Sequence, residues 1–327
     1  MITLPLCLMQ TYLDNLSSNV EEIDISKRRL KELPDLGRFQ KLKMLNCSHN
    51  QIENLNNLPV TLITLNCSFN QIENIDNLPF TLIELCCHDN KIENLDNLPF
   101  TLIKLYCGVN EIKSLGNLPV TLIELNCHDN KIKSLDNLPF TLIELYCGAN
   151  QIKSLNNLPF TLIELYCGNN QIENLDNLPF TLITLYCYIN KIKSLDNLPF
   201  TLITLYCGNN QIENLNNLPV TLMILYCGAN KIKSLDNLPF ALMTLNCDSI
   251  IESVNYLKKI RLLKEISITI KYSSLIEKWF LNRIKFNKKN IHNELKYSPD
   301  LKFYYDEISL ITKKSFKDLS IIKESNI

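Results

Sequence analysis

The stretches TLIELYCGNNQIENLDNLPF, residues 161–180, and TLITLYCGNNQIENLNNLPV, residues 201–220, differ at three positions. From Leu42 onward the chain repeats every 20 residues in the frame L-x-x-L-x-C-x-x-N-x-I-x-x-L-x-x-L-P. The asparagine recurs from Asn50 to Asn230 at this period. A fixed period of this length indicates a solenoid of stacked units rather than a globular domain.

Each repeat predicts its own local structure. The alternation L-x-L-x-C favours a short strand with one face turned inward, and strands of stacked units should pair in parallel. The asparagine amide can satisfy backbone groups at the following turn, so the stacked asparagines should form a hydrogen-bonded ladder. The rest of the unit contains proline and is too short for a helix, which predicts an extended, polyproline-like convex side. Seven glycines in 327 residues predict few turns with positive φ.

This frame resembles that of the leucine-rich repeat family over about residues 20–247. The resemblance implies an α/β solenoid, a horseshoe of about twelve units in residues 20–248 with a parallel sheet on its concave side. The period of 20 residues with Leu-Pro-x-Thr-Leu before the strand is similar to the short-repeat bacterial effectors of the YopM and IpaH type. The richness in Ile, Lys, Asn and Tyr resembles the leucine-rich repeat proteins of amoeba-infecting giant viruses.

The chain departs from the effector pattern in two respects. Cysteine replaces the usual aliphatic residue at the third inward strand position. The ubiquitin-ligase domain of the IpaH type requires a catalytic Cys-x-Asp and a longer tail, whereas Cys247 is followed by Asp248-Ser249 and is the last cysteine. Ligase activity therefore does not follow from the resemblance.

The two ends should cap the exposed core of the solenoid. Residues 1–19 are too few for a domain and are predicted to be the N-terminal cap. Residues 249–327 change to a helical period and are predicted to be a helical C-terminal cap or small domain. Residues 250–327 hold 16 basic and 9 acidic residues, a surplus of +7, which leaves open a basic module for acidic partners or a membrane surface.

Charge and composition exclude several classes of protein. The formal net charge of −1 argues against a general nucleic-acid binder. No uninterrupted apolar stretch reaches the roughly 18 residues of a membrane span. The segment 1–16 has no basic residue before its short apolar run and is a poor signal peptide. We therefore expect a reducing, cytoplasmic location, which for a pathogen protein includes the host cytoplasm.

The sequence predicts no cofactor, no metal and no catalytic site. Eleven of the 13 cysteines stack at the repeat period from Cys47 to Cys247, and parallel buried thiols do not converge on a metal ion. Buried cysteine should act as a small apolar filler. His88-Asp89 and His128-Asp129 lie two repeats apart, too far to share a metal, and side chains adjacent in a strand should point to opposite sides.

The outward strand positions are the candidate partner site on the concave face. Tyrosine recurs there, with glutamate two residues earlier in several repeats, and glycine after the cysteine should leave room for a partner. A tyrosine stripe is typical of protein-binding surfaces, and a self-packing tyrosine ladder is the alternative. The carboxylates would repel nucleic acid and favour a protein with a basic surface. The candidate residues are Tyr106, Glu124, Glu144, Tyr146, Glu164, Tyr166, Tyr186, Tyr206 and Tyr226.

These observations favour a non-catalytic protein-binding scaffold, with host interaction implied by the family resemblance. An edge patch around Lys113, Lys131, Lys133 and Lys153 is either a second contact surface or a solvated edge. One alternative function is a substrate-recruiting adaptor of a ubiquitin ligase, for which Leu4 to Leu16 resembles a weak elongin-binding box. A further alternative is enzymatic activity in the C-terminal segment, which contains one histidine and no cysteine.

Overall fold

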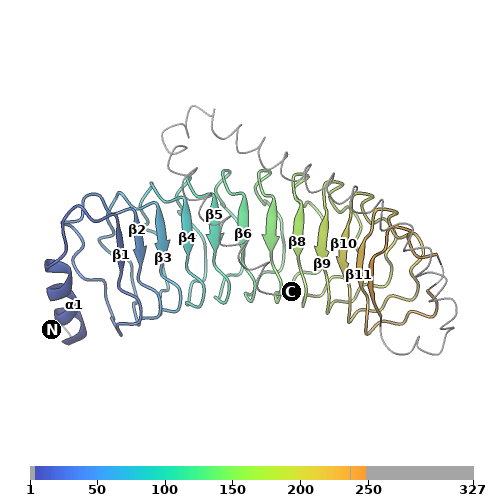
Figure 1. Cartoon of the computed structure of the whole chain (residues 1–327), viewed down its shortest axis with the longest axis horizontal. Coiled ribbons are helices and arrows are strands. Elements are labelled where there is room, and N and C mark those ends of the chain that lie inside the picture. Colours follow the sequence, from blue (N-terminus) through green and yellow to red (C-terminus); the bar gives the residue numbers. More distant parts are fainter. Residues whose placement is uncertain (1–3, 236, 248–327) are drawn as a thin grey trace. The chain divides into compact units, whose positions relative to one another are not determined.

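The computed structural model describes residues 4–235 and 237–247. The predicted C-terminal helices lie outside these residues. One helix, α1 (Leu4–Asp14), precedes twelve strands that form one parallel sheet in chain order, as Figure 1 shows for the labelled strands. The strands are β1 (Glu22–Asp24), β2 (Met44–Asn46), β3 (Thr64–Asn66), β4 (Glu84–Cys86), β5 (Lys104–Tyr106), β6 (Glu124–Asn126), β7 (Glu144–Tyr146), β8 (Glu164–Tyr166), β9 (Thr184–Tyr186), β10 (Thr204–Tyr206), β11 (Ile224–Tyr226) and β12 (Thr244–Asn246).

The register of the sheet follows the repeat. Leu165 of β8 is paired with Leu185 of β9, an offset of one repeat, and the same offset holds from β2 to β12. Only the first pair differs, because Ile23 faces Leu45 across the longer first unit. The predicted parallel solenoid of about twelve strands is therefore confirmed.

The core is a continuous column of apolar side chains inside the repeats. In one unit Leu162, Leu165, Cys167, Ile172 and Leu175 are at most 1 % exposed, and the equivalent residues of neighbouring units pack against them. Burying an aliphatic side chain of this size contributes about 1.5–3 kcal/mol relative to leaving it in water. A single unit has nothing to bury these residues against, so the array folds through contacts between units.

The predicted asparagine ladder is confirmed. Asn170 donates from Nδ2 to the carbonyl oxygens of Cys147 at 3.0 Å and Cys167 at 3.1 Å. Its Oδ1 accepts the backbone N–H of Ile152 at 3.0 Å. Each asparagine thus ties its own turn to that of the preceding repeat, so the ladder supports the inter-repeat contacts that the core requires.

The expectation of few positive-φ turns is wrong. The chain uses non-glycine residues at two positions of nearly every repeat: the residue before the ladder asparagine, such as Asn169 at φ 56°, and a convex-side asparagine such as Asn177 at φ 61°. Asparagine tolerates this region better than most residues, but Val109 and Ile189 also adopt it, at 54° and 52°. No glycine among the described residues has positive φ, so glycine serves another purpose here.

Helix α1 lies at the N-terminal end of the array (Figure 1) and contributes Met9 and Leu13 to the core cluster. Leu13 is fully buried, whereas Cys7 and Leu8 are exposed. The segment that the adaptor alternative assigns to docking is thus partly used to cover the first repeat. The described part of the chain contains no helix with the length and apolar character needed to cross a membrane.

Candidate protein-binding face

The first and third residues of the three-residue strands form one surface, which we call the open sheet face. In β8 the middle residue Leu165 is fully buried, while Glu164 and Tyr166 on either side are half-buried. The same pattern recurs from β2 to β11. All the candidate tyrosines and glutamates lie on this face, brought to one surface by the parallel register.

The tyrosines of β7 to β11 form one continuous stack. The ring centroids of Tyr146, Tyr166, Tyr186, Tyr206 and Tyr226 are successively 4.3, 4.5, 4.1 and 4.3 Å apart, with interplanar angles of 18° or less. In-register strands lie about 4.8 Å apart, which is close to the centroid separation of two stacked aromatic rings. The rings therefore cover one another's faces and present their edges and hydroxyls outward.

Tyr106 of β5 stands apart from this stack because Asn126 occupies its position in β6. Its hydroxyl donates to Glu124 Oε1 at 2.8 Å, and Tyr166 donates to Glu164 Oε2 at 3.2 Å. Burial, and secondarily the neighbouring carboxylates, raise the pKa of Tyr106 and Tyr166. The phenols remain neutral hydrogen-bond donors at physiological pH.

A basic residue interrupts the acidic row. Lys104 occupies the glutamate position in β5 and its Nζ lies 3.2 Å from Glu124 Oε2. Burial raises the pKa of Glu84, which Lys104 partly offsets. Lys104 is not among the sequence-predicted site residues, although the repeat frame places it at the glutamate position. The acidic part of the open sheet face is therefore centred on Glu144 and Glu164 of β7 and β8, beside the start of the tyrosine stack.

The prediction that glycines leave room for a partner is wrong at two positions. A Cβ on Gly108 would lie 2.3 Å from the ring of His128, and one on Gly168 would lie 2.7 Å from the ring of Tyr188. The bulkier residue of the next repeat fills the space instead. At Gly148 a Cβ would meet the carbonyl oxygen of Gly168 at 3.1 Å, so glycine here serves close packing of consecutive turns.

The histidines have local partners. His88 Nδ1 lies 3.1 Å from Asp89 Oδ2, so the expectation that the two side chains point apart is wrong. They belong to a turn, where strand alternation does not hold. His128 Nδ1 lies 2.7 Å from Asn126 Oδ1 instead. Burial raises the pKa of the nearby Cys86 thiol to about 12, which leaves the pair without a thiolate nucleophile.

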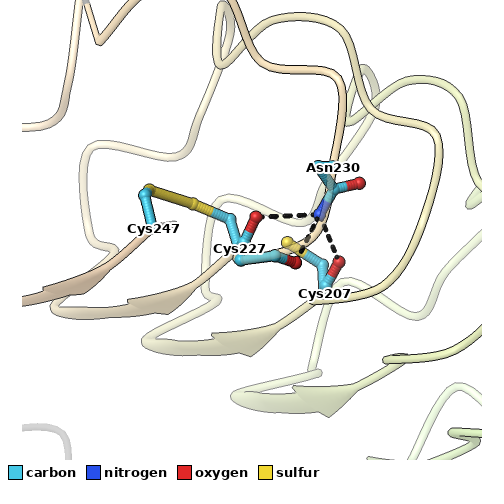
Figure 2. The surroundings of a disulfide bond; sticks show 5 residues. Cys207, Cys227, Asn230 and Cys247 are labelled. Carbon is cyan, nitrogen blue, oxygen red and sulfur yellow. Dashed lines mark hydrogen bonds between the residues drawn. A yellow bond between two sulfur atoms is a disulfide. The ribbon is translucent and has the colours of Figure 1, made fainter. Parts of the chain in front are cut away.

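The buried cysteines form a stack beneath the sheet. Burial raises the pKa of the thiols of Cys127 and Cys167 to about 12, so they are neutral and apolar. Cys227 and Cys247 form a disulfide (Figure 2), with Cα atoms 5.1 Å apart, so the expectation of unpaired fillers is wrong for this pair. Neighbouring parallel strands lie within the Cα separation that a disulfide spans. Within the described residues no three potential ligands gather as a metal site requires.

Ion pairs neutralise half of the predicted lysine patch. Lys113 Nζ lies 2.7 Å from Glu93 Oε2, and Lys131 Nζ lies 2.8 Å from Glu111 Oε2. Each pair joins adjacent repeats on an exposed edge, where such pairs contribute little to stability. This arrangement favours the solvated edge over a second contact surface.

A twelve-stranded parallel sheet with one strand per repeat, an asparagine ladder and a leucine core makes this chain a leucine-rich repeat protein. Among solved structures, YopM from Yersinia enterocolitica WA-314 is similar at 33 % identity and a TM-score of 0.66 over 71 % of this chain. The chain spans about half, 52 %, of that YopM chain. YopM from Yersinia pestis, a leucine-rich effector protein, is similar at 26 % identity and a TM-score of 0.60, covering 71 % of this chain and 75 % of its own.

The functional domain of InlJ from Listeria monocytogenes, which includes a cysteine ladder, is 26 % identical with a TM-score of 0.58. The match covers 70 % of this chain and 58 % of InlJ. A cysteine ladder thus also occurs in another protein of similar fold. No family model matches this chain, and the comparison with curated proteins gives no match.

Proposed function

We propose that this chain is a non-catalytic protein-binding scaffold whose open sheet face holds a protein partner with a basic surface. The observation that carries the proposal is the tyrosine stack of β7 to β11 beside Glu144 and Glu164. The pre-stacked rings lose little side-chain entropy on binding, and their edges supply both apolar contact and hydroxyl groups.

The carboxylates give the proposal its charge selectivity. Glu164 accepts from the Tyr166 hydroxyl at one oxygen, so its position is fixed relative to the stack. A basic side chain that enters beside Tyr146 and Tyr166 meets both tyrosine hydroxyls and a carboxylate, a combination that favours arginine or lysine. We therefore expect binding to weaken as the salt concentration rises.

The partner is proposed to be a host-cell protein met in the cytoplasm, supported by the likeness to YopM, described as an effector in Yersinia pestis. Buried neutral thiols are compatible with a reducing compartment, whereas the Cys227–Cys247 disulfide is of a kind that persists in oxidising ones. Alkylation of the intact protein in cells, followed by mass spectrometry, would show the state of this pair and so test the compartment.

The test is affinity capture from candidate host lysate with two variants of the face. Tyr146→Ser, Tyr166→Ser and Tyr186→Ser together remove the stack, Glu144→Gln with Glu164→Gln removes the charge alone, and circular dichroism establishes that each variant is folded. We expect the first variant to weaken capture at least about tenfold, the cost of losing aromatic anchors. We expect the second to weaken it less and to reduce its salt dependence.

The matched control is Glu173→Gln with Glu213→Gln, which removes the same charge from exposed residues outside the sheet. This control should capture the partner as the parent chain does. Equal capture by the parent and by the folded tyrosine variant would refute the proposal.

A further inference from the structure

An exposed apolar row runs along the array on the side where the chain enters each strand. Every twentieth residue from Val60 to Phe240 is phenylalanine or valine, and each of these side chains is 61–79 % exposed. We call this row the apolar ridge. It is separate from the open sheet face, because its members precede the strands by four residues.

The backbone of the ridge is fixed although its side chains are exposed. The hydroxyl of Thr161 donates to the carbonyl oxygens of Phe140 at 2.6 Å and Leu142 at 2.8 Å in the preceding repeat. The equivalent threonines repeat these bonds at both ends of the array, for example Thr81 with Val60 and Thr221 with Phe200. The exposed side chains therefore belong to an ordered row with the period of the repeats.

The ridge is larger than the apolar patches of typical monomeric proteins. A phenylalanine side chain covers roughly 200 Å², so the seven phenylalanines at 61–79 % exposure present roughly 900 Å² together. Isolated soluble proteins rarely expose a contiguous apolar patch of more than a few hundred Å². A stable interface buries about 800 Å² on each partner, which the ridge alone supplies.

The charges beside the ridge argue against a membrane as the occupant. Along the chain Phe140 is flanked four residues away by Asp136 and Glu144, and only one lysine, Lys104, stands at that distance from any ridge residue. An anionic bilayer attracts polybasic segments and would be repelled by this edge. The residues directly before and after Phe140 are proline and threonine, so two ridges can meet without opposing like charges.

We propose that the apolar ridge is the interface between two copies of this chain, paired antiparallel about a two-fold axis. A row with one apolar residue per repeat, such as Phe80 and Phe100 with ring centroids 6.3 Å apart, is matched best by a row of the same period, which a second copy provides. In full antiparallel overlap Phe140 of one copy faces Phe160 of the other. The three valines, Val60, Val120 and Val220, then all face phenylalanines, whereas parallel overlap would set valine against valine.

The first test is sedimentation velocity of the full chain across a concentration series. We expect a dimer, and we expect Phe140→Ser with Phe160→Ser and Phe180→Ser to raise its dissociation constant at least tenfold. Circular dichroism should be unchanged because these side chains are 61–62 % exposed. The control Leu8→Ser with Tyr12→Ser, which removes exposed apolar side chains of α1 outside the ridge, should leave the dimer intact.

The second test is the orientation of the pair. In a Cys7→Ser background, chains carrying Phe100→Cys are mixed with chains carrying Phe200→Cys and treated with a short bis-maleimide. Antiparallel pairing predicts a cross-linked product in the mixture and little from either chain alone. Cross-linking of Phe100→Cys chains with one another would overturn the antiparallel arrangement.

Three results would overturn the proposal itself: a monomer at every concentration, a dimer unaffected by the ridge variant, or ridge-dependent flotation with phosphatidylserine vesicles in place of dimerisation.

The proposal is independent of the partner on the open sheet face. The folded tyrosine variant should still dimerise. High salt should also strengthen the dimer, because it screens the flanking acidic residues and favours apolar burial, whereas it should weaken partner binding.

Discussion

Replacing Asn130 by alanine tests the asparagine ladder in the middle of the array. Asn130 is 8 % exposed, and its Nδ2 donates to the carbonyl oxygens of Cys107 and Cys127, both at 3.1 Å. Its Oδ1 accepts the backbone N–H of Ile112 at 2.9 Å. The substitution removes all of these bonds at once without changing the strands.

The hydrogen bonds that the substitution removes differ in their free-energy cost. The carbonyls of Cys107 and Cys127 each keep a second donor, Asn110 and Asn150 respectively, both at 3.0–3.1 Å. The N–H of Ile112 has no second acceptor, and a buried donor without a partner costs roughly 1–3 kcal/mol. Adding about 0.5–1 kcal/mol for each donated bond, we expect Asn130→Ala to lower the free energy of unfolding by about 3 kcal/mol.

Urea unfolding followed by far-ultraviolet circular dichroism measures the global effect, and hydrogen exchange of the Ile112 amide measures the local one. The control is Asn156→Ala, an exposed asparagine on the convex side, which should change stability by less than about 0.5 kcal/mol. An Asn130→Ala chain as stable as this control, with unchanged exchange at Ile112, would refute the account of the ladder.

Three further outcomes follow from the structure. The pKa of the Cys127 and Cys167 thiols is about 12 when folded against 9.0 when exposed, so the unfolded chain releases protons first above pH 9. The free energy of unfolding should fall by about 1 kcal/mol per thiol at pH 10, and thermal melts of the double alanine variant should show a shallower loss. Tyr186→Ser should lower the free energy of unfolding by about 1–2 kcal/mol and Tyr186→Phe by much less, measured in urea, since only the first breaks the stack. Val109→Asn should raise the melting temperature and increase the free energy of unfolding by about 1 kcal/mol, because asparagine tolerates positive φ better than valine and Asn209 already adopts it at the equivalent position. An unchanged or lower melting temperature would contradict this expectation.

The features that repeat within each unit were predictable from the sequence. The alternation around Leu165 specifies a strand, and Asn170 specifies a polar group buried at a turn. A near-identical unit follows 20 residues later, so the partner of each group is the same group in the next repeat. Strand order, register and the ladder follow from that identity alone, because parallel stacking is the one arrangement that buries every unit's apolar face.

The details of the candidate site were less predictable. The tyrosine stripe is visible in the sequence, but the half-burial of Tyr186 between two rings depends on the strand spacing. The space beside Gly108 is filled by His128 of the next repeat. The presence of glycine at one position does not reveal whether a neighbouring side chain occupies that space. Positive φ at Val109 runs against local preference and is imposed by the stacking of turns.

The sequence by itself determined the architecture of this protein: a period, an inward face and a parallel leucine-rich repeat sheet. Only the tertiary structure decided which outward side chains are covered. The sheet spacing brings each residue within contact distance of its counterpart one repeat away, so aromatic rings on the strands cover one another. The ridge residues, such as Phe160, project at a turn instead and remain 61–79 % exposed. That difference comes from backbone direction at the turn, which residue type does not specify.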